Sequence, residues 1–353
     1  MTPIIQLGLG GVGRALARQI LAVAPAIRRR YGIDLRYVAL VDSRGAVAGD
    51  PALSEAQVRH ILAVKEAGNG IDSLAGAIVD RHWIELLPAA MAIVVDVTAA
   101  GGHAAPLAAA VSAGHRVVLA NKRPLCEGYD LFAALTERGA TRYEATVGAG
   151  LPVISTLQSL LDSGDEVLCI EAALSGTLGF LMSELEAGAG FANAVRNAHR
   201  LGYTEPDPRD DLSGADVARK ALILARTCGM HLPADAVIAE SLFPAHLAEV
   251  SVAEFLQRLN EAEAAVMNRL AAARSNGNVL RYISRITPER VEVGLREFPA
   301  SHPLASLRGP DNLISFTTRR YHDRPLVVRG PGAGVEVTAA GVLSDIIATA
   351  REL

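Results

Sequence analysis

Residues 3–21, PIIQLGLGGVGRALARQIL, contain the pattern that decides the fold of the first part of the chain. A short apolar run at residues 4–9 predicts a buried strand, and apolar residues from Val12 onward follow helical spacing. Between the two lies GLGGVG, a G-x-G-x-x-G pattern in the strand-to-helix context that a dinucleotide-binding turn requires. The stretch therefore predicts the first strand and helix of a nucleotide-binding domain.

Each glycine of this pattern has a physical task. Gly8 allows the tight turn, Gly10 lets a pyrophosphate approach the backbone, and Gly13 lets the helix pack closely on the strand. The N-terminus of the helix offers free N–H groups to phosphates. We expect cofactor contacts along the whole turn: Gly8, Leu9, Gly10, Gly11, Val12 and Gly13. A tight packing turn without a ligand is the alternative.

Apolar strands and helices continue to alternate after this turn. Strands are predicted at residues 35–42, 92–100, 116–121 and 141–147, with helices at 103–113 and 129–138. This alternation favours an α/β fold with a Rossmann-type, doubly wound parallel sheet, which binds ligands beyond the carboxyl ends of its strands. Thr98, Asn121 and Lys122 fall at such ends, and Thr98, Ala99 and Lys122 are candidate cofactor contacts. Otherwise Thr98 caps a helix and Lys122 is a solvated loop lysine.

The length of 353 residues exceeds what one hydrophobic core usually serves, so we expect two domains. The first would be a nucleotide-binding domain of residues 1–147, and the second would comprise residues 148–330. Its β-rich runs at 279–287, 290–298, 313–321 and 324–330 predict an α+β domain with a mostly antiparallel sheet.

Composition argues against several classes of partner. The net charge is -4 and aromatic residues make up 4% of the chain, so neither a nucleic acid nor an anionic membrane surface is expected as a partner. Three widely spaced cysteines lack a metal-ligand spacing and are expected to be reduced thiols of a cytoplasmic protein. The predicted strand directly after Met1 leaves no room for a signal peptide, and no apolar run reaches membrane-spanning length.

Residues 202–220, GYTEPDPRDDLSGADVARK, combine five acidic residues with two prolines and then become helical. If the segment is only a surface loop, Ser213 and Asp216 would form a capping box that starts the helix. Asp216 and Lys220 would then form an i,i+4 ion pair on its face. The helix that follows is mostly apolar, however, so Lys220 would be largely buried and would need a nearby carboxylate. The alternative is the wall of a site for a small charged substrate.

Several blocks of the chain, in order, resemble the homoserine dehydrogenase family: GLGGVG, ANK, EATVGAGLP, SGTLGF, GYTEPDPRDDLSGADVARK and GPGAGVEVTAAGVLSD. The resemblance covers the whole chain and implies NAD(P)H-dependent, reversible reduction of L-aspartate 4-semialdehyde to L-homoserine, a step in threonine, methionine and isoleucine biosynthesis. It also implies a homodimer. No kinase or regulatory domain is expected beside these blocks.

The resemblance also implies roles for individual residues. Lys220 would donate the proton during reduction, with a pKa lowered by burial, and Lys122 would add positive charge at the reacting centre. Glu205 and Asp216 would bind the substrate ammonium, and Asp211 would support them. Residues 331–353 would rejoin the nucleotide-binding domain, with Gly334 near the cofactor. Residues 148–330 would bind substrate and mediate dimerisation.

A structural monovalent cation, Na⁺ or K⁺, is a further feature that the resemblance implies. The Glu144 carboxylate and the carbonyls of Val147, Ala149 and Leu151 would form an all-oxygen cage, which suits a hard cation. Alternatively, the glycines of this segment only permit a sharp crossover between the domains.

The end of the second predicted strand bears on the choice of cofactor. Asp42 and Arg44 stand where the adenosine ribose would lie, and many relatives carry a small or neutral residue in place of Asp42. A carboxylate there accepts hydrogen bonds from both ribose hydroxyls of NAD and repels the 2′-phosphate of NADP. Arg44 would offset part of that repulsion. We therefore expect NAD to be used at least as well as NADP.

Two other functions remain open at this point. One is another amino-acid or semialdehyde dehydrogenase on the same scaffold. A phosphorylating semialdehyde dehydrogenase would need a nucleophilic cysteine, for which the chain offers no supporting context. The other is a nicotinamide-binding regulator without catalysis, which would be expected to lack Lys220 or part of the acidic set.

Overall fold

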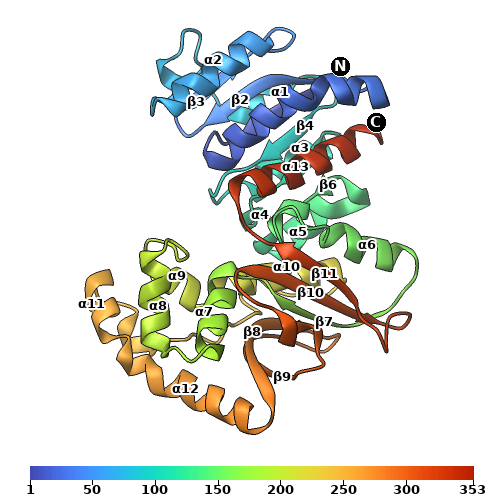
Figure 1. Ribbon diagram of the computed structural model, residues 1–353. Helices are drawn as coiled ribbons and strands as arrows, with labels where there is room; N and C mark the ends of the chain where they lie inside the picture. The colour runs from blue at the N-terminus through green and yellow to red at the C-terminus, as the bar shows by residue number, and fades with distance from the viewer. The chain divides into compact units, whose positions relative to one another are not determined.

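The computed structural model describes all 353 residues, which divide into two compact units. The first comprises Met1–Gly150 together with Ala333–Leu353, and the second comprises Leu151–Gly332 (Figure 1). No helix of either unit has the combination of length and hydropathy that a bilayer crossing demands.

A six-stranded sheet with the order β3-β2-β1-β4-β5-β6 forms the centre of the first unit. Its strands are parallel except for β3, which pairs antiparallel with β2 at the edge. The bounds are β1 Thr2–Leu7, β2 Leu35–Asp42, β3 Gly45–Ala48, β4 Ile93–Asp96, β5 Arg116–Leu119 and β6 Thr141–Arg142. The central strands are buried on both faces, as their continuous apolar runs predict. The predicted Rossmann-type sheet is confirmed.

The helices of the first unit include one from the far end of the chain. They are α1 Gly11–Tyr31, α2 Glu55–Glu66, α3 Ala104–Ser112, α4 Arg123–Cys126, α5 Tyr129–Thr136 and α13 Val335–Ala350. Short 3₁₀ turns lie at Ile71–Ser73, Trp83–Leu86, Glu137–Gly139 and Glu144–Thr146. Figure 1 shows α13 alongside α1, and the two helices contribute to the same apolar core. The C-terminal segment therefore completes the first unit.

Two of the predicted strands are much shorter than the sequence indicated. The run at residues 92–100 yields only β4, because the Asp96 side chain accepts hydrogen bonds from the Thr98 backbone and hydroxyl and turns the chain. The run at residues 141–147 yields only β6. Backbone bonds from Thr146 to Tyr143 and from Val147 to Glu144 close a 3₁₀ turn after it. Local hydrogen bonding outweighed β propensity at both places.

The second unit is built on a five-stranded sheet with the order β11-β10-β7-β8-β9, in which every pair is antiparallel. Its strands are β7 Val167–Ala173, β8 Asn278–Ile286, β9 Val291–Pro299, β10 Asp311–Thr318 and β11 Leu326–Pro331. Its α-helices are α6 Ile154–Asp162, α7 Gly176–Glu186, α8 Phe191–Arg200, α9 Pro208–Leu212, α10 Ala215–Thr227, α11 Val252–Arg258 and α12 Asn260–Ser275. Two 3₁₀ turns, η5 Ala245–Leu247 and η6 Pro303–Ser306, complete it.

Strand β8 is buried on both of its faces. Helices α7, α10 and α12 pack against it, and its Tyr282 hydroxyl donates to the Glu240 carbonyl. Residues that alternate with Tyr282 point the other way, where Ile283 packs with Phe298 and Leu304 in a separate apolar cluster. The helices thus cover one face of β8, and the segment around η6 covers the other.

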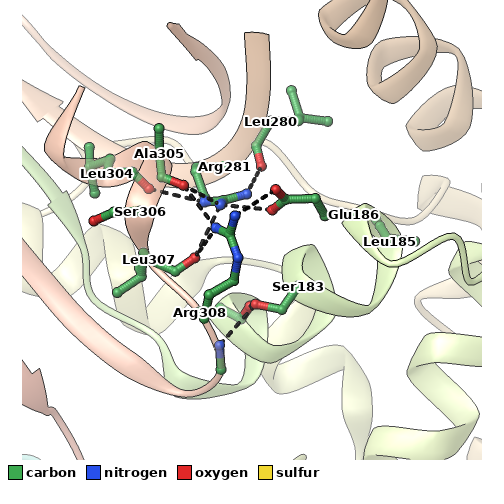
Figure 2. Close-up of polar contacts among 12 residues, drawn as sticks. Ser183, Leu185, Glu186, Leu280, Arg281, Leu304, Ala305, Ser306, Leu307 and Arg308 are labelled. Carbon is green, nitrogen blue, oxygen red and sulfur yellow. Dashed lines mark hydrogen bonds and ion pairs between the residues drawn. The ribbon is translucent and has the colours of Figure 1, made fainter. Parts of the chain in front are cut away.

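Arg281 lies at the centre of a buried polar cluster on β8 (Figure 2). Its guanidinium donates to the Glu186 carboxylate at 2.9 Å and to four backbone carbonyls, those of Leu280, Leu304, Ala305 and Leu307. Arg308 binds the other oxygen of Glu186, also at 2.9 Å, but its side chain is 57% exposed. Arg281 therefore fastens the η6 segment to β8 and to the end of α7.

Replacing Arg281 tests this fastening. Arg281→Ala leaves several buried carbonyls without their donor and is expected to destabilise the second unit by about 3 kcal/mol. Arg308→Ala removes the exposed partner of the same carboxylate and is expected to cost less than about 1 kcal/mol. Chemical denaturation followed by a probe in the second unit measures both variants. Equal losses for the two would contradict the role given to Arg281.

Candidate functional site

The glycine turn after β1 has the geometry that its spacing predicts. Gly8 adopts a positive φ of 103°, and a Cβ added there would lie 3.0 Å from the Thr98 side chain. At Gly13 an added Cβ would come within 2.1 Å of the Gly8 carbonyl oxygen. Gly10, the N-cap of α1, has no heavy atom within 4 Å of such a Cβ. Gly8 and Gly13 are thus required by the fold, whereas the space above Gly10 is open.

The N-terminus of α1 carries no side-chain cap and no acidic residue in its first turn. Its first N–H groups and the positive end of the helix dipole are therefore suited to an anionic group such as a pyrophosphate. Gly334 precedes α13 with a φ of 120°, and an added Cβ at Gly11 would lie 3.4 Å from the Val335 side chain. The C-terminal segment thus lies beside the glycine turn within the first unit.

Gln6, to which the sequence analysis assigned no role, holds this turn through hydrogen bonds of its side chain. The Gln6 side chain is fully buried, and its amide donates to the carbonyls of Gly8 and Gly13 at 2.9 Å each. Its amide oxygen accepts from the Tyr37 hydroxyl at 2.7 Å. A polar residue in an otherwise apolar strand, two positions before the first glycine, was the available signal.

Asp42, predicted to face the adenosine ribose, is already engaged within the first unit. One carboxylate oxygen accepts from the Lys65 ammonium at 2.6 Å and from the Ile71 N–H at 3.3 Å. The other accepts from the Arg44 N–H at 2.7 Å. Burial opposes ionisation, but the hydrogen bonds from Lys65 and the Arg44 N–H hold the pKa of Asp42 below its usual value. Lys65, 23 residues away in sequence, neutralises much of the negative charge of Asp42. The expected repulsion of the 2′-phosphate of NADP depended on that charge.

A buried carboxylate organises the ends of β4 and β5. Asp96 is fully buried and accepts from Thr98 through one oxygen. Its other oxygen binds Asn121 at 3.0 Å and His103 at 2.9 Å. The hydrogen bond to Asp96 raises the pKa of His103 above its ordinary value. The sequence reasoning assigned no role to Asp96 or His103, although Asp96 ends an apolar strand at the ligand-binding edge.

The remaining first-unit candidates lie at this same edge. Ala99 is exposed one residue after Thr98, and Asn121 donates to the Thr98 hydroxyl and to the Ala100 carbonyl. Lys122 is half-buried and precedes α4 directly. The candidates at the carboxyl ends of the strands are thus brought to one edge of the sheet.

Lys220 lies in the second unit on α10, and the residue is 9% exposed. Its ammonium binds the Asp216 carboxylate at 2.8 Å and the Leu174 carbonyl at 2.7 Å. The predicted i,i+4 pair is therefore present on a mostly buried helix. A buried ammonium with two oxygen partners has a fixed position, as a catalytic acid requires.

The start of α10 differs from the predicted capping box. The N-cap is Gly214 with a φ of 70°, and no side chain caps the helix. Asp216 instead directs its carboxylate to Lys220, while the Ser213 hydroxyl accepts from the Ala215 N–H. A Cβ at position 214 would lie 2.0 Å from the Tyr282 hydroxyl, so only glycine fits there. This contact with β8 could not be read from the local sequence.

The acidic residues that precede α10 fall into two groups. Asp207 caps α9 and binds Arg209, which also donates to the carbonyls of Leu247, Ala248 and Val250. Arg209 lowers the pKa of Asp207, so this pair clamps the loop. Asp207 is therefore engaged with Arg209 within the loop. Asp210 is exposed.

Glu205, Asp211 and Asp216 form the second group. An oxygen of Asp211 accepts from the Glu205 N–H at 2.8 Å. Burial raises the pKa of Asp211, and the charges of Glu205 and Asp216 raise it further. Three carboxylates next to one buried lysine form a site that would stabilise a cationic ligand.

The segment predicted to bind a cation is buried and offers only oxygen ligands. Glu144 is 6% exposed, its N–H donates to Asp345, and Ala149 adopts a left-handed φ of 56°. Burial and the charge of Glu144 raise the pKa of Asp345 to about 7. Val147 and Ala149 are buried, whereas the Leu151 carbonyl already accepts from Val153 at 2.8 Å. Two adjacent buried carboxylates would be stabilised by a hard cation, so this donor set fits one.

Comparisons with known proteins agree on one family. The family profile described as homoserine dehydrogenase matches residues 152–347. A homoserine dehydrogenase of Emericella nidulans is 42% identical over 279 residues, covering 74% of this chain and 76% of that protein. The chloroplastic bifunctional aspartokinase/homoserine dehydrogenase 2 of Arabidopsis thaliana is 38% identical over 355 residues. That alignment covers 98% of this chain but only 38% of the bifunctional relative.

The solved structures give the same result. A hyperthermophilic archaeal homoserine dehydrogenase in complex with NADPH superposes with a TM-score of 0.75 at 26% identity. The match covers 100% of this chain and 98% of that one. The family profile, the curated relatives and the solved structure agree, and this chain belongs to the homoserine dehydrogenase family of NAD(P)-dependent oxidoreductases.

Proposed function

We propose that this protein catalyses the reversible, NAD(P)H-dependent reduction of L-aspartate 4-semialdehyde to L-homoserine, in the biosynthesis of threonine, methionine and isoleucine. The observation that carries the proposal is the buried Lys220 ammonium, bound to Asp216 and next to further carboxylates on the same unit. A substrate with an ammonium group and a carbonyl oxygen matches this pairing of negative charges with a proton donor.

The chemistry assigned to Lys220 follows from its position. When the aldehyde carbon gains a hydride, its oxygen becomes an alkoxide, and the Lys220 ammonium donates a proton to that oxygen to give the alcohol. In the oxidative direction neutral Lys220 accepts the hydroxyl proton. Asp216 and the Leu174 carbonyl fix the ammonium in place during both directions. Lys122 remains a predicted second cation for the reaction.

The acidic residues have a separate role. Glu205 takes part in no ion pair with a protein cation, so its carboxylate is free to bind the substrate ammonium. Asp216 contributes to the same charge, and Asp211 holds the Glu205 backbone. Recognition of an ammonium by these carboxylates discriminates against substrates that lack it, because their negative charge would then have no ligand cation beside it.

The first unit would hold the cofactor. A bound nicotinamide dinucleotide would supply the hydride for reduction and accept it in the reverse direction. The glycine turn and the open N-terminus of α1 would bind its pyrophosphate, with Leu9, Val12 and Gly334 beside them. Thr98 and Ala99, at the ends of the strands, would contact the nicotinamide half. Asp42 and Arg44, at the end of β2, would lie at the adenosine ribose.

A monovalent cation, held by Glu144, Val147, Ala149 and Leu151, would stabilise the crossover that follows the 3₁₀ turn Glu144–Thr146. Its contribution would be structural, and no step of the reaction depends on it. The homodimer and the cytoplasmic location remain predictions based on the family.

The catalytic assignment is tested by replacing Lys220. Lys220→Ala should lower kcat about 10²- to 10⁴-fold, the usual range for a general acid–base group. Cofactor affinity should hardly change, because Lys220 belongs to the second unit. Arg219→Ala is the matched control, because Arg219 is exposed and its guanidinium lies 3.8 Å from Asp216, against 2.8 Å for the Lys220 ammonium. A kcat close to wild type in Lys220→Ala would refute the role of this lysine.

The proposed use of NAD at least as well as NADP is tested at Asp42. Asp42→Ser removes a ribose acceptor and leaves Lys65 free to bind a 2′-phosphate. We expect the ratio of kcat/KM for NADP to that for NAD to rise at least about 10-fold, as a new charge-assisted hydrogen bond would allow. Adding Lys65→Met should reverse most of this rise. An unchanged ratio in Asp42→Ser would show that Asp42 does not act on the cofactor ribose.

A further inference from the structure

The short segment of Tyr203, Thr204 and Glu205 is positioned by three side chains from three different helices. Thr177 at the start of α7 donates to the Tyr203 carbonyl at 2.6 Å. Asp211 on α9 accepts from the Glu205 N–H at 2.8 Å. Between these two contacts, Nδ1 of a histidine on α8 lies 3.1 Å from the Thr204 hydroxyl oxygen. That histidine, His199, had no role in the sequence analysis.

The hydrogen-bond directions around Thr204 follow from its single hydroxyl proton. The hydroxyl donates to the Glu205 carbonyl at 2.9 Å. It therefore accepts from His199, whose Nδ1 must carry a hydrogen. The result is a directional chain of hydrogen bonds from His199 through Thr204 to the backbone of Glu205.

Backbone hydrogen bonds from Gly202 to the His199 carbonyl, at 3.1 Å, and from Tyr203 to the Ala198 carbonyl, at 2.9 Å, hold only the start of this segment. Leu201 is 48% exposed and Tyr203 46%, so the apolar contacts that fix most loops are weak here. Tyr203 packs on Phe180, with ring centroids 4.6 Å apart, and this contact fixes only the beginning of the segment. Beyond Tyr203, the position of the Glu205 backbone depends on the bonds from His199 and Asp211.

We propose that His199 is a positioning residue for substrate binding: through Thr204 it sets the place of Glu205, the residue that would bind the substrate ammonium. The proposal deepens the proposed function and rests on it. His199 would act on substrate affinity without touching the substrate. A merely structural histidine in the last turn of α8 would instead affect the stability of the unit and leave the KM unchanged.

Steady-state kinetics of the full chain test this proposal. His199→Ala should raise the KM for L-homoserine roughly 2- to 10-fold, as expected for the loss of one hydrogen bond. It should leave the cofactor KM and kcat within about twofold of wild type. His199→Asn places an amide donor near the position of Nδ1 and should restore most of the substrate KM. His322→Ala is the matched control, because His322 bonds only the exposed, adjacent Asp323.

The same measurement on Glu205→Gln separates this proposal from the function on which it rests. Glu205→Gln should itself raise the substrate KM, and adding His199→Ala should raise it little further, because both changes act on one contact. A full additional rise in the double variant would overturn the proposed route through Glu205. An unchanged KM in His199→Ala, or a failure of His199→Asn to restore it, would overturn the positioning role alone. An unchanged KM in Glu205→Gln would refute the proposed function of the acidic set.

Discussion

The ion pair between Lys220 and Asp216 is the interaction on which the second unit's site depends. An ammonium on a helix as buried as α10 would be costly without partners, and Asp216 and the Leu174 carbonyl supply them. This requirement constrains the start of the helix as well. Asp216 is committed to Lys220, and the helix begins at Gly214, which alone fits against Tyr282. The buried Lys220 thus links α10 to the end of β7 through the Leu174 carbonyl, and Gly214 places the start of α10 against β8.

Within the acidic segment, similar residues serve different physical purposes. Asp207 and Arg209 form a clamp that holds α9 to the 247–250 loop. Asp211 is half-buried, and its carboxylate holds the backbone of Glu205. Glu205 itself is exposed and has no protein cation as a partner. The fold therefore uses some of the acids to fix the loop, which leaves negative charge available for a ligand.

The fold class and the ion pair between Asp216 and Lys220 could be predicted because their signals are local. The glycine turn, the alternation of strands and helices, and the four-residue spacing of Asp216 and Lys220 are all visible in short stretches of sequence. The cation site depended on family resemblance, and the roles of the residues at the cation and dinucleotide sites remain predictions.

What could not be predicted depends on contacts between residues far apart in the chain. Lys65 neutralises Asp42 from another element, and Tyr282 excludes any residue but glycine at the start of α10. Gln6 and Asp96 each looked like a lone polar residue in a strand, although they organise the glycine turn and the strand ends. Such roles emerge only when tertiary structure brings the donors and acceptors together.

The central claim is that the second unit recognises an ammonium group on the molecule that Lys220 helps to oxidise or reduce. Formation of reduced nicotinamide from L-homoserine, compared with 4-hydroxybutanoate, which lacks the amino group, tests it most directly. The account predicts turnover of L-homoserine with at least one of NAD and NADP, and a kcat/KM at least about 100-fold lower for 4-hydroxybutanoate, because the carboxylates would then have no ligand cation beside them. Equal use of the two alcohols, or no turnover of L-homoserine with either cofactor, would contradict it.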